Sequence, residues 1–308
     1  MTSMNVSRTK NKIRWTAEDI SIETISLIIG IFIFIVTLYP FYYCLILSLN
    51  EGRDATMGGI YFWPRAFTFR NYTRFFTDVG WLNAIWISVS KTALGTCLCL
   101  FFTCLIAYGL SYPGLALRNT YGKIFLFCMY FNAGLIPTYM VIRSLGLTNN
   151  FLVYIIPSMF SIYFCILARS FFKSIPFELV ESAKLDGASD FFVFVRIIIP
   201  LSKPLLATLA LYTAVERWNA WSDTAFYAPT NKNLRSLSFM MRNVILQTVT
   251  SPSMSAEELA ARAAAGVTET ARSVQMAAMM ITIAPIIIIY PFVQKYFVKG
   301  IMLGAVKG

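Results

Sequence analysis

The sequence contains no histidine and few charged residues. None of its 308 residues is histidine, and Asp, Glu, Lys and Arg together make up only 13% of the chain. Without histidine, the chain cannot form a Ser-His-Asp triad, an HExxH zinc site or a histidine proton relay. Soluble domains carry about 25% charged residues, so the low charge also argues against an ordinary soluble protein.

Apolar residues take the place of the missing charge. The chain is 57% hydrophobic and 16% aromatic, with a mean hydropathy of +0.63. A single globular core could not bury this much apolar surface, so the excess needs lipid as its solvent. The composition therefore predicts a polytopic membrane protein of the all-α class.

Six segments are candidates for membrane spans, because a helix needs about 20 apolar residues to cross a bilayer core. They run over residues 25–49, 93–110, 124–142, 152–167, 201–221 and 274–292. A basic cluster from Arg8 to Arg14 precedes the first span and places the N-terminus in the cytoplasm. Six spans then return the C-terminus to the same side. The net charge of +11 fits this topology better than it fits a nucleic-acid partner.

Lys91 and the six cysteines have simple structural interpretations. Lys91 precedes the second predicted span at its outer end, where its stem can snorkel to the headgroups. The cysteines lie in apolar stretches without metal-site spacing, and we expect them to be buried as small hydrophobic side chains. They are Cys44, Cys97, Cys99, Cys104, Cys128 and Cys165.

Two outer segments are long enough to have structure of their own. Residues 51–80 are rich in aromatic side chains and fit an extended crossing at the membrane interface. In residues 222–273, Ser255 and Glu258 form a capping box, and the helix that follows should stop at Gly266. This short helix fits plain loop structure and a contact surface for an external partner equally well.

The cytoplasmic segment between the fourth and fifth spans, residues 172–204, departs from the apolar pattern. Pro176 can begin a helix, with Glu178 and Glu181 near its positive end. Gly187 interrupts this helix, and a second amphipathic piece follows and ends at two prolines. Such a segment would protrude and could be gripped by a partner, although a loop that merely closes the inner face fits equally well.

The same segment resembles the EAA loop of permease subunits in bacterial ABC importers. The resemblance rests on Glu181-Ser-Ala-Lys-Leu-Asp-Gly-Ala188, followed at fixed spacing by Phe194, Ile197 and Pro200-Leu-Ser-Lys-Pro204. The one departure is Ser182, where the family usually has alanine. Further segments resemble the carbohydrate branch, especially its polysaccharide and complex-oligosaccharide members. These are residues 67–72, 107–111, 134–147 and 298–308, so that the resemblance covers roughly residues 60–308.

The resemblance implies the type I permease fold of ABC importers, with six transmembrane helices in a bacterial plasma membrane. It implies a subunit that takes up oligosaccharides delivered by an extracytoplasmic solute-binding protein. A second homologous permease and two cytoplasmic ATPase subunits would complete the complex. The chain has no GxxxxGK[ST] loop, so ATP and Mg²⁺ belong on the ATPases. We expect no catalytic residue, metal site or cofactor on this chain.

The predicted spans and the resemblance together divide the chain, and the resemblance assigns residues to the ATPase contact. The divisions are a cytoplasmic tail (1–24), the first span with its outer segment (25–80), the permease core (81–292) and a second tail (293–308). Glu181 would make the polar contact, Ala183 would permit close approach and Gly187 would supply the turn. Asp186 would either contact the ATPase or cap the helix beyond the break. The complete coupling set is Glu181, Ser182, Ala183, Leu185, Asp186, Gly187, Ala188, Phe194 and Pro200.

Two further contacts follow from the same resemblance. The outer loop 222–273 would dock on the binding protein. The end of the chain would lie against the ATPases, through Gly304, Val306, Lys307 and Gly308.

Sugar binding calls for aromatic faces and hydrogen-bonding groups in a concave cavity. The candidates for a substrate pathway are Asn132, Tyr139, Tyr212, Glu216, Trp218 and Asn219. Glu216 and Arg217 interrupt an apolar run and should face a water-filled cavity or each other. Trp218 and Trp221 also fit an interfacial aromatic belt. The companion permease is the alternative place for the sugar contacts.

Two rival classes are less consistent with the sequence. A secondary transporter or channel for a small polar solute would need intramembrane carboxylates or inverted repeats, and Glu216 stands alone. A membrane hydrolase would need a nucleophile with a base. Neither class requires the motif from Glu181 to Gly187.

Overall fold

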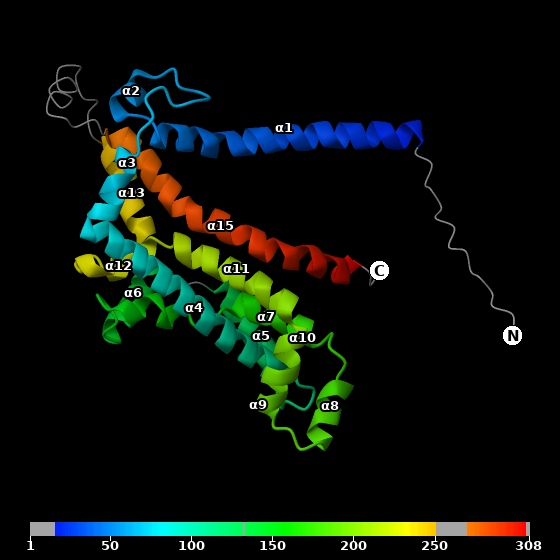
Figure 1. Ribbon diagram of the computed structural model, residues 1–308. Helices are drawn as coiled ribbons and strands as arrows, with labels where there is room; N and C mark the ends of the chain where they lie inside the picture. Colours follow the sequence, from blue (N-terminus) through cyan, green and yellow to red (C-terminus); the bar gives the residue numbers. More distant parts are fainter. Residues whose placement is uncertain (1–15, 132, 251–269, 306–308) are drawn as a thin grey trace.

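The computed structural model describes residues 16–131, 133–250 and 270–305, which form helices and their connections (Figure 1). Within these residues there is no strand, only an isolated antiparallel bridge between Asn50 and Phe67. Three long apolar helices match the first, second and sixth predicted spans. They are α1 (Ala17–Ser48), α4 (Val79–Ser111) and α15 (Ala271–Ala305).

The first helix begins earlier than the apolar pattern predicts. The Thr16 side chain accepts a hydrogen bond from the Asp19 amide, and the Asp19 carboxylate accepts one from the Thr16 amide, which forms a capping box. Helix α1 therefore starts at Ala17, inside the predicted tail 1–24. No part of its apolar window is buried by the rest of the chain, and Figure 1 shows its N-terminal half running away from the other helices.

The other three predicted spans are bent helix pairs, a feature that the apolar pattern does not predict. The pairs are α5 (Arg118–Tyr130) with α6 (Leu135–Ser144) at 111°, Phe151–Ser158 with α7 (Ile162–Phe172) at 46°, and Asp190–Leu201 with α11 (Lys203–Asn219) at 84°. With each pair taken as one span, the described residues provide up to six spans.

Glycine and proline account for the bends. Gly134 precedes α6 with a φ of +83°, and Pro137 lies in the first turn of α6. Pro157 lies in a short 3₁₀ helix, Ile156–Ser158, and Pro204 lies at the start of α11. A proline is tolerated in the first turn of a helix, where its missing amide hydrogen costs no bond, and each of these prolines lies near the start of a helical segment.

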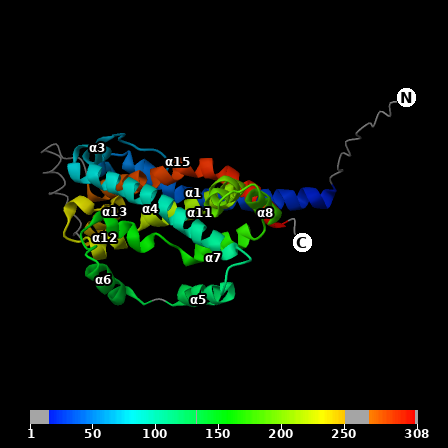
Figure 2. The same cartoon turned by 90° about the horizontal axis from the view of Figure 1, so that it is seen from below.

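Helix α4 lies at the centre of the bundle. It packs against α7 and α11, while α15 packs against α1, α11 and α13 (Leu237–Thr250). Figure 2 shows α5 and α6 set apart along one side. With 33 residues, α4 is about 50 Å long and exceeds a bilayer core of about 30 Å. We refer below to the α8 end and the α12 end of this bundle.

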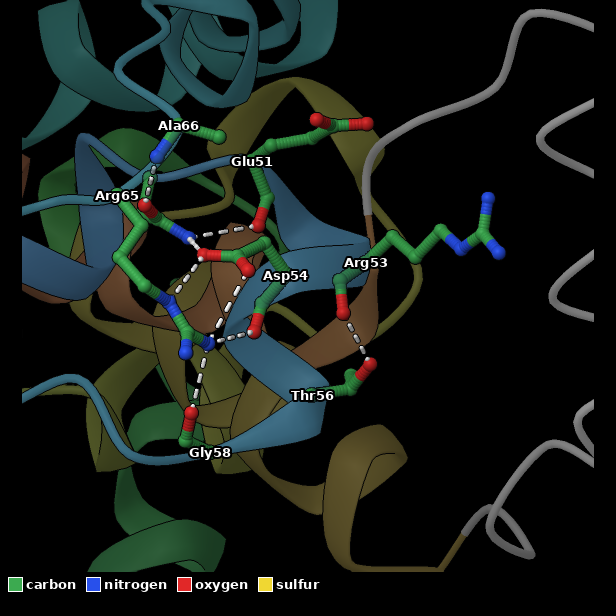
Figure 3. A network of polar contacts seen from close by, with 8 residues as sticks. Glu51, Arg53, Asp54, Thr56, Gly58, Arg65 and Ala66 are labelled. Atoms are coloured by element: carbon green, nitrogen blue, oxygen red, sulfur yellow. Dashed lines mark hydrogen bonds and ion pairs between the residues drawn. The ribbon is translucent and has the colours of Figure 1, made fainter.

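The segment after α1 contains two short helices, and the aromatic stretch predicted to be extended lies between them without helical structure. These are α2 (Gly52–Met57) and α3 (Arg70–Thr77). Arg65 forms an ion pair with Asp54 at 3.1 Å and donates to the Gly58 carbonyl at 2.8 Å (Figure 3). Asn50 Nδ2 donates to the same carboxylate at 2.9 Å. These contacts hold the loop that follows α2 against α2.

Asn71 and Tyr72 attach this segment to the end of α1. The buried Asn71 Nδ2 donates to the carbonyls of Ser48 and Asn50, each at 2.8 Å. The hydroxyls of Tyr72 and Ser48 lie 2.6 Å apart. The motif at residues 67–72 thus has a structural role that is independent of any ligand.

The segment at the α12 end contains α12 (Ser222–Tyr227), a 3₁₀ turn (Lys232–Leu234) and α13. The capping box at Ser255 and the helix predicted to end at Gly266 lie outside the described residues.

Half of the cysteines contradict the expectation of burial. Cys99, Cys104 and Cys165 are buried, whereas Cys97 and Cys128 are exposed and Cys44 is half-buried. An apolar side chain that faces lipid needs no cover from its own chain, so an apolar stretch does not by itself predict burial in protein.

Candidate functional site

Helix α8 (Glu178–Leu185) follows α7 and precedes α9 (Asp190–Val193) in the chain, and it projects at one end of the bundle beside α9 (Figure 1). It begins two residues after Pro176, because the Pro176 and Phe177 carbonyls accept the first amides of the turn. Glu178 and Glu181 lie in this first turn, as the sequence predicts. Acidic side chains at this position are favoured by the helix dipole.

The end of α8 is a Schellman turn built on Gly187. The Ala188 amide donates to the Ala183 carbonyl at 2.9 Å, and the Gly187 amide donates to the Lys184 carbonyl at 3.0 Å. Gly187 has a φ of +80°, a conformation that favours glycine. The predicted break at this residue is confirmed.

Asp186 does not cap the helix beyond the break. Ser189 takes that place, with its side chain accepting a hydrogen bond from the Phe192 amide at 3.3 Å. Asp186 ends α8 and is exposed. Of the two roles expected for Asp186, the capping role is therefore wrong, and the partner contact stays a prediction.

The outward surface of α8 combines polar and apolar side chains. Leu185 is 90% exposed, and Leu179 is exposed as well. Ala183 and Ala188 are half-buried. The other exposed residues of the predicted coupling set are Glu181, Ser182, Asp186, Gly187 and Pro200. A leucine this exposed on a short ordered helix outside the membrane spans suggests that another surface covers it.

Phe194 lies on the opposite, buried side of this loop. It is 2% exposed, and its ring packs on Tyr108 of α4 with 5.4 Å between ring centroids. Val180 of α8 belongs to the same core cluster. The structure therefore excludes Phe194 from direct contact with a partner. Its position joins the loop to α4, since a buried aromatic ring anchors the elements that it contacts.

Lys184 forms a second connection to α4, which the sequence reasoning missed. Its Nζ lies 2.7 Å from Asp190 Oδ1 and 3.2 Å from the Tyr112 hydroxyl, and it stands over the Tyr112 ring. The bonds to Asp190 and then to Tyr112 raise the pKa of Lys184. The available signal in the sequence was Asp190, an acidic residue six positions after Lys184 on the other side of the break at Gly187.

Arg217 forms a buried polar junction near the α12 end of α11. Its guanidinium donates to the Tyr154 carbonyl at 3.2 Å, and to the hydroxyl and the carbonyl of Ser158. It is 9% exposed and packs over Gly95 of α4. Arg217 thus ties α4, α11 and the residues before α7 together. It neither faces a water-filled cavity nor pairs with Glu216.

Lys91 belongs to the same junction, and the snorkelling prediction is wrong. Helix α4 begins at Val79, so Lys91 lies a third of the way along it and is 2% exposed. Its Nζ donates to the Ala220 carbonyl at 2.6 Å and stands over the Tyr154 ring. The nearby Asp223, on α12, has its pKa raised by burial, with Lys91 and Arg217 acting in the opposite direction.

Helix α11 carries three of the predicted pathway residues on one exposed face. Tyr212, Glu216 and Asn219 follow one another at the i, i+4, i+7 spacing of one helix side, and all three are exposed. Trp218 points the other way, into the core beside α15, where its Nε1 donates to the Thr282 carbonyl at 2.9 Å. The structure supports neither a pathway role nor an interfacial-belt role for Trp218.

The remaining predicted residues are separate from this face. Tyr139 on α6 stacks on Tyr227 of α12 with 6.3 Å between ring centroids. Gly304 lies in the last turn of α15. Asn132, Val306, Lys307 and Gly308 lie outside the described residues.

Known proteins resemble the chain along most of its length. Protein LplC of Bacillus subtilis (strain 168) is 34% identical over 274 residues, which cover 89% of this chain and 90% of that protein. The polygalacturonan/rhamnogalacturonan transport system permease protein YtcP of the same organism is 30% identical over 274 residues, with 89% and 94% covered.

A solved structure shows the same fold. One chain of a bacterial ABC transporter involved in the import of the acidic polysaccharide alginate superposes with a TM-score of 0.82 at 29% identity, covering 92% of this chain and 99% of that chain. Residues 21–303 match the description "binding-protein-dependent transport system inner membrane component". The chain belongs to this family of membrane permease components.

Proposed function

We propose that the chain is the permease subunit of an ATP-driven importer of oligosaccharides and that α8 is its coupling helix. The observation that carries this proposal is the surface of α8, where Leu185 is 90% exposed beside Glu181 and Asp186. The family is one of transport components rather than enzymes, and similar proteins are named for transport of sugar polymers.

The contacts behind α8 supply a route for coupling. An ATPase that moves α8 would move α4 with it, because Phe194 packs on Tyr108 and Lys184 binds Tyr112. Both tyrosines lie at the α8 end of α4. The motion would alternate the opening of the permease between the two sides of the membrane, driven by ATP and Mg²⁺ on the ATPases.

The partners in this proposal are a second permease, two ATPase subunits and a solute-binding protein outside the cell. The uncovered apolar surface of α1 fits contact with lipid and with the second permease. Both termini would be cytoplasmic, and the α8 end would face the ATPases together with the tail 304–308. The segment 222–273 would dock on the binding protein.

The substrate pathway in this proposal follows the exposed face of α11. Glu216 interrupts the apolar run of α11 and is exposed, and a carboxylate there would be costly against lipid. A water-filled passage satisfies it, with Tyr212 and Asn219 beside it offering an aromatic face and an amide to a sugar.

Co-purification tests the assignment first. The tagged chain is extracted gently from its native membranes, and the polypeptides that accompany it are identified by mass spectrometry. We expect a second permease and an ATPase. A lone chain, under conditions that preserve other membrane complexes, would contradict the proposal.

Uptake gives the direct functional test. The purified complex is placed in proteoliposomes with a candidate binding protein and labelled oligosaccharides of defined length. We expect accumulation with ATP and none with ADP. Equal uptake with both nucleotides would favour a secondary transporter or channel.

A further inference from the structure

A cavity of about 360 Å³ lies between α4, α5 and α7 at the α8 end of the bundle. Its apolar wall includes Phe125, Leu126 and Ile166, and its polar wall includes Lys123 and Arg169. Arg169 lies in the last turn of α7, which ends at Phe172, and Lys123 lies in the middle of α5 (Arg118–Tyr130). The cavity therefore combines cationic and apolar walls.

Arg169 lacks an acceptor in this cavity. Its Nε is enclosed and makes no hydrogen bond. The guanidinium lies close to Gly122, where an added Cβ would be 3.0 Å from Nη1. The two ion pairs between described residues, Arg65–Asp54 and Lys184–Asp190, involve neither Arg169 nor Lys123. An enclosed guanidinium donor without an acceptor is costly, and an anion would relieve that cost.

Two more cations extend the same positive region. Arg118, at the start of α5, and Lys173, just after α7, line a second cavity of about 290 Å³. The pKa of Lys173 is lowered by desolvation and then by the charges of Arg169 and Arg118. Four cations thus line α5 and the end of α7, and none of them forms an ion pair with a described carboxylate.

We infer that the first cavity binds an anionic phospholipid, with its phosphate on Arg169 and Lys123 and an acyl chain along Phe125, Leu126 and Ile166. A free phosphate would satisfy the cations but would leave the apolar wall empty. Basic pockets between membrane helices are suited to anionic headgroups. Placement in the inner leaflet rests on the orientation proposed above, whereas the binding itself does not.

Lipid retention tests the inference without any transport assay. The intact complex is reconstituted into nanodiscs of equal parts phosphatidylglycerol and phosphatidylcholine, re-extracted, and its bound lipids are measured by native mass spectrometry. We expect the wild type to retain phosphatidylglycerol preferentially. Arg169→Gln and Lys123→Gln should each lower this retention about fivefold, the effect of about one surface cation.

Matched variants separate lipid binding from other causes. Arg143→Gln removes a cation from the last turn of α6, away from the cavity, and should leave retention unchanged. Arg169→Lys keeps the charge and should restore much of the retention. Leu126→Trp fills the apolar wall without changing a cation and should reduce it.

Three results would overturn the inference. One is equal retention of both lipids by the wild type, and another is equal loss in Arg143→Gln. The third is displacement of the lipid by millimolar inorganic phosphate, which would identify a site for a free anion. None of these results bears on sugar uptake, so failure of this inference would not contradict the proposed function.

Discussion

The environments of Arg217 and Leu185 are the reverse of what the polarity of each side chain favours. Arg217 is charged and 9% exposed, while Leu185 is apolar and 90% exposed. The junction around Arg217 bonds its two terminal nitrogens within the chain, to the Tyr154 and Ser158 oxygens, and leaves its Nε without an acceptor. The surface of α8 leaves its leucines uncovered. The first region is therefore held mainly by contacts within the chain, whereas in the proposed function a partner covers the second.

This difference separates stability from function. Substitutions in the junction should unfold or loosen the chain and affect transport only through folding. Substitutions on α8 should leave the chain folded and affect its partners. The predictions below test this division, from the largest expected effect to the smallest.

Arg217→Ala should be the most destabilising change. It removes a charged donor from the Tyr154 and Ser158 carbonyls and leaves a void beside Gly95, at a cost of about 3 kcal/mol. Thermal unfolding of the purified chain in detergent measures the effect. Arg143→Ala, at the end of α6, is the control and should change the midpoint little. Equal midpoints for the two variants would show that the buried junction contributes nothing.

Leu185→Ser should weaken binding of the ATPase without lowering the stability of the chain. Covering a leucine side chain contributes about 2 kcal/mol, or roughly thirtyfold in affinity. The measurement is titration of the permease with ATPase subunits. Leu145→Ser, at an exposed leucine that follows α6, is the control. If Leu185→Ser bound as tightly as the wild type, α8 would not be the docking surface.

Gly95→Ala and Gly109→Ala should affect stability differently, although both glycines lie in α4. A Cβ at Gly95 would lie 2.9 Å from Arg217 Cδ, whereas a Cβ at Gly109 meets nothing within 4 Å. We expect the first change to cost about 1–2 kcal/mol through overpacking. The second should be neutral or slightly stabilising through helix propensity. Unfolding midpoints that fall equally would refute the close packing of Arg217 on α4.

Lys184→Met should have the smallest effect, about 0.5 kcal/mol, since its ion pair with Asp190 is largely solvated. The pKa of Lys184 is raised above its usual 10.5. Its contribution is therefore fully present below that value and is lost as pH rises through the folded pKa. Thermal midpoints of both proteins from pH 8 into the alkaline range should converge. A constant difference across this range would contradict the ion pair.

The sequence predicted the regions where local chemistry decides the structure. Gly187 ends α8 because the turn needs a positive φ, and the acidic first turn follows from the residues themselves. The long apolar helices were also found. The prediction for Lys91 was wrong because polar residues in the first turns of α4 made the helix look shorter than it is. Only the fold brings the Ala220 carbonyl to Lys91.

Contacts between residues far apart in the chain could not be predicted from the sequence. The packing of Phe194 on Tyr108 joins residues far apart in the chain, and a motif match cannot say which side of a loop is buried. The same holds for Trp218, whose partner carbonyl is on α15. The bends at Gly134 and Pro204 had visible signals, but hydropathy alone joins such segments into one span.

The coupling role of α8 is tested most directly by measuring ATP hydrolysis and sugar uptake together in proteoliposomes. Gly187→Asp is compared with Gly146→Asp, because both glycines have a positive φ and open space around a Cβ, but Gly146 lies outside the coupling loop. We predict that Gly187→Asp, like Glu181→Lys, retains insertion and loses uptake relative to ATP hydrolysed, while Gly146→Asp keeps the wild-type ratio. A wild-type ratio in Gly187→Asp would contradict the account.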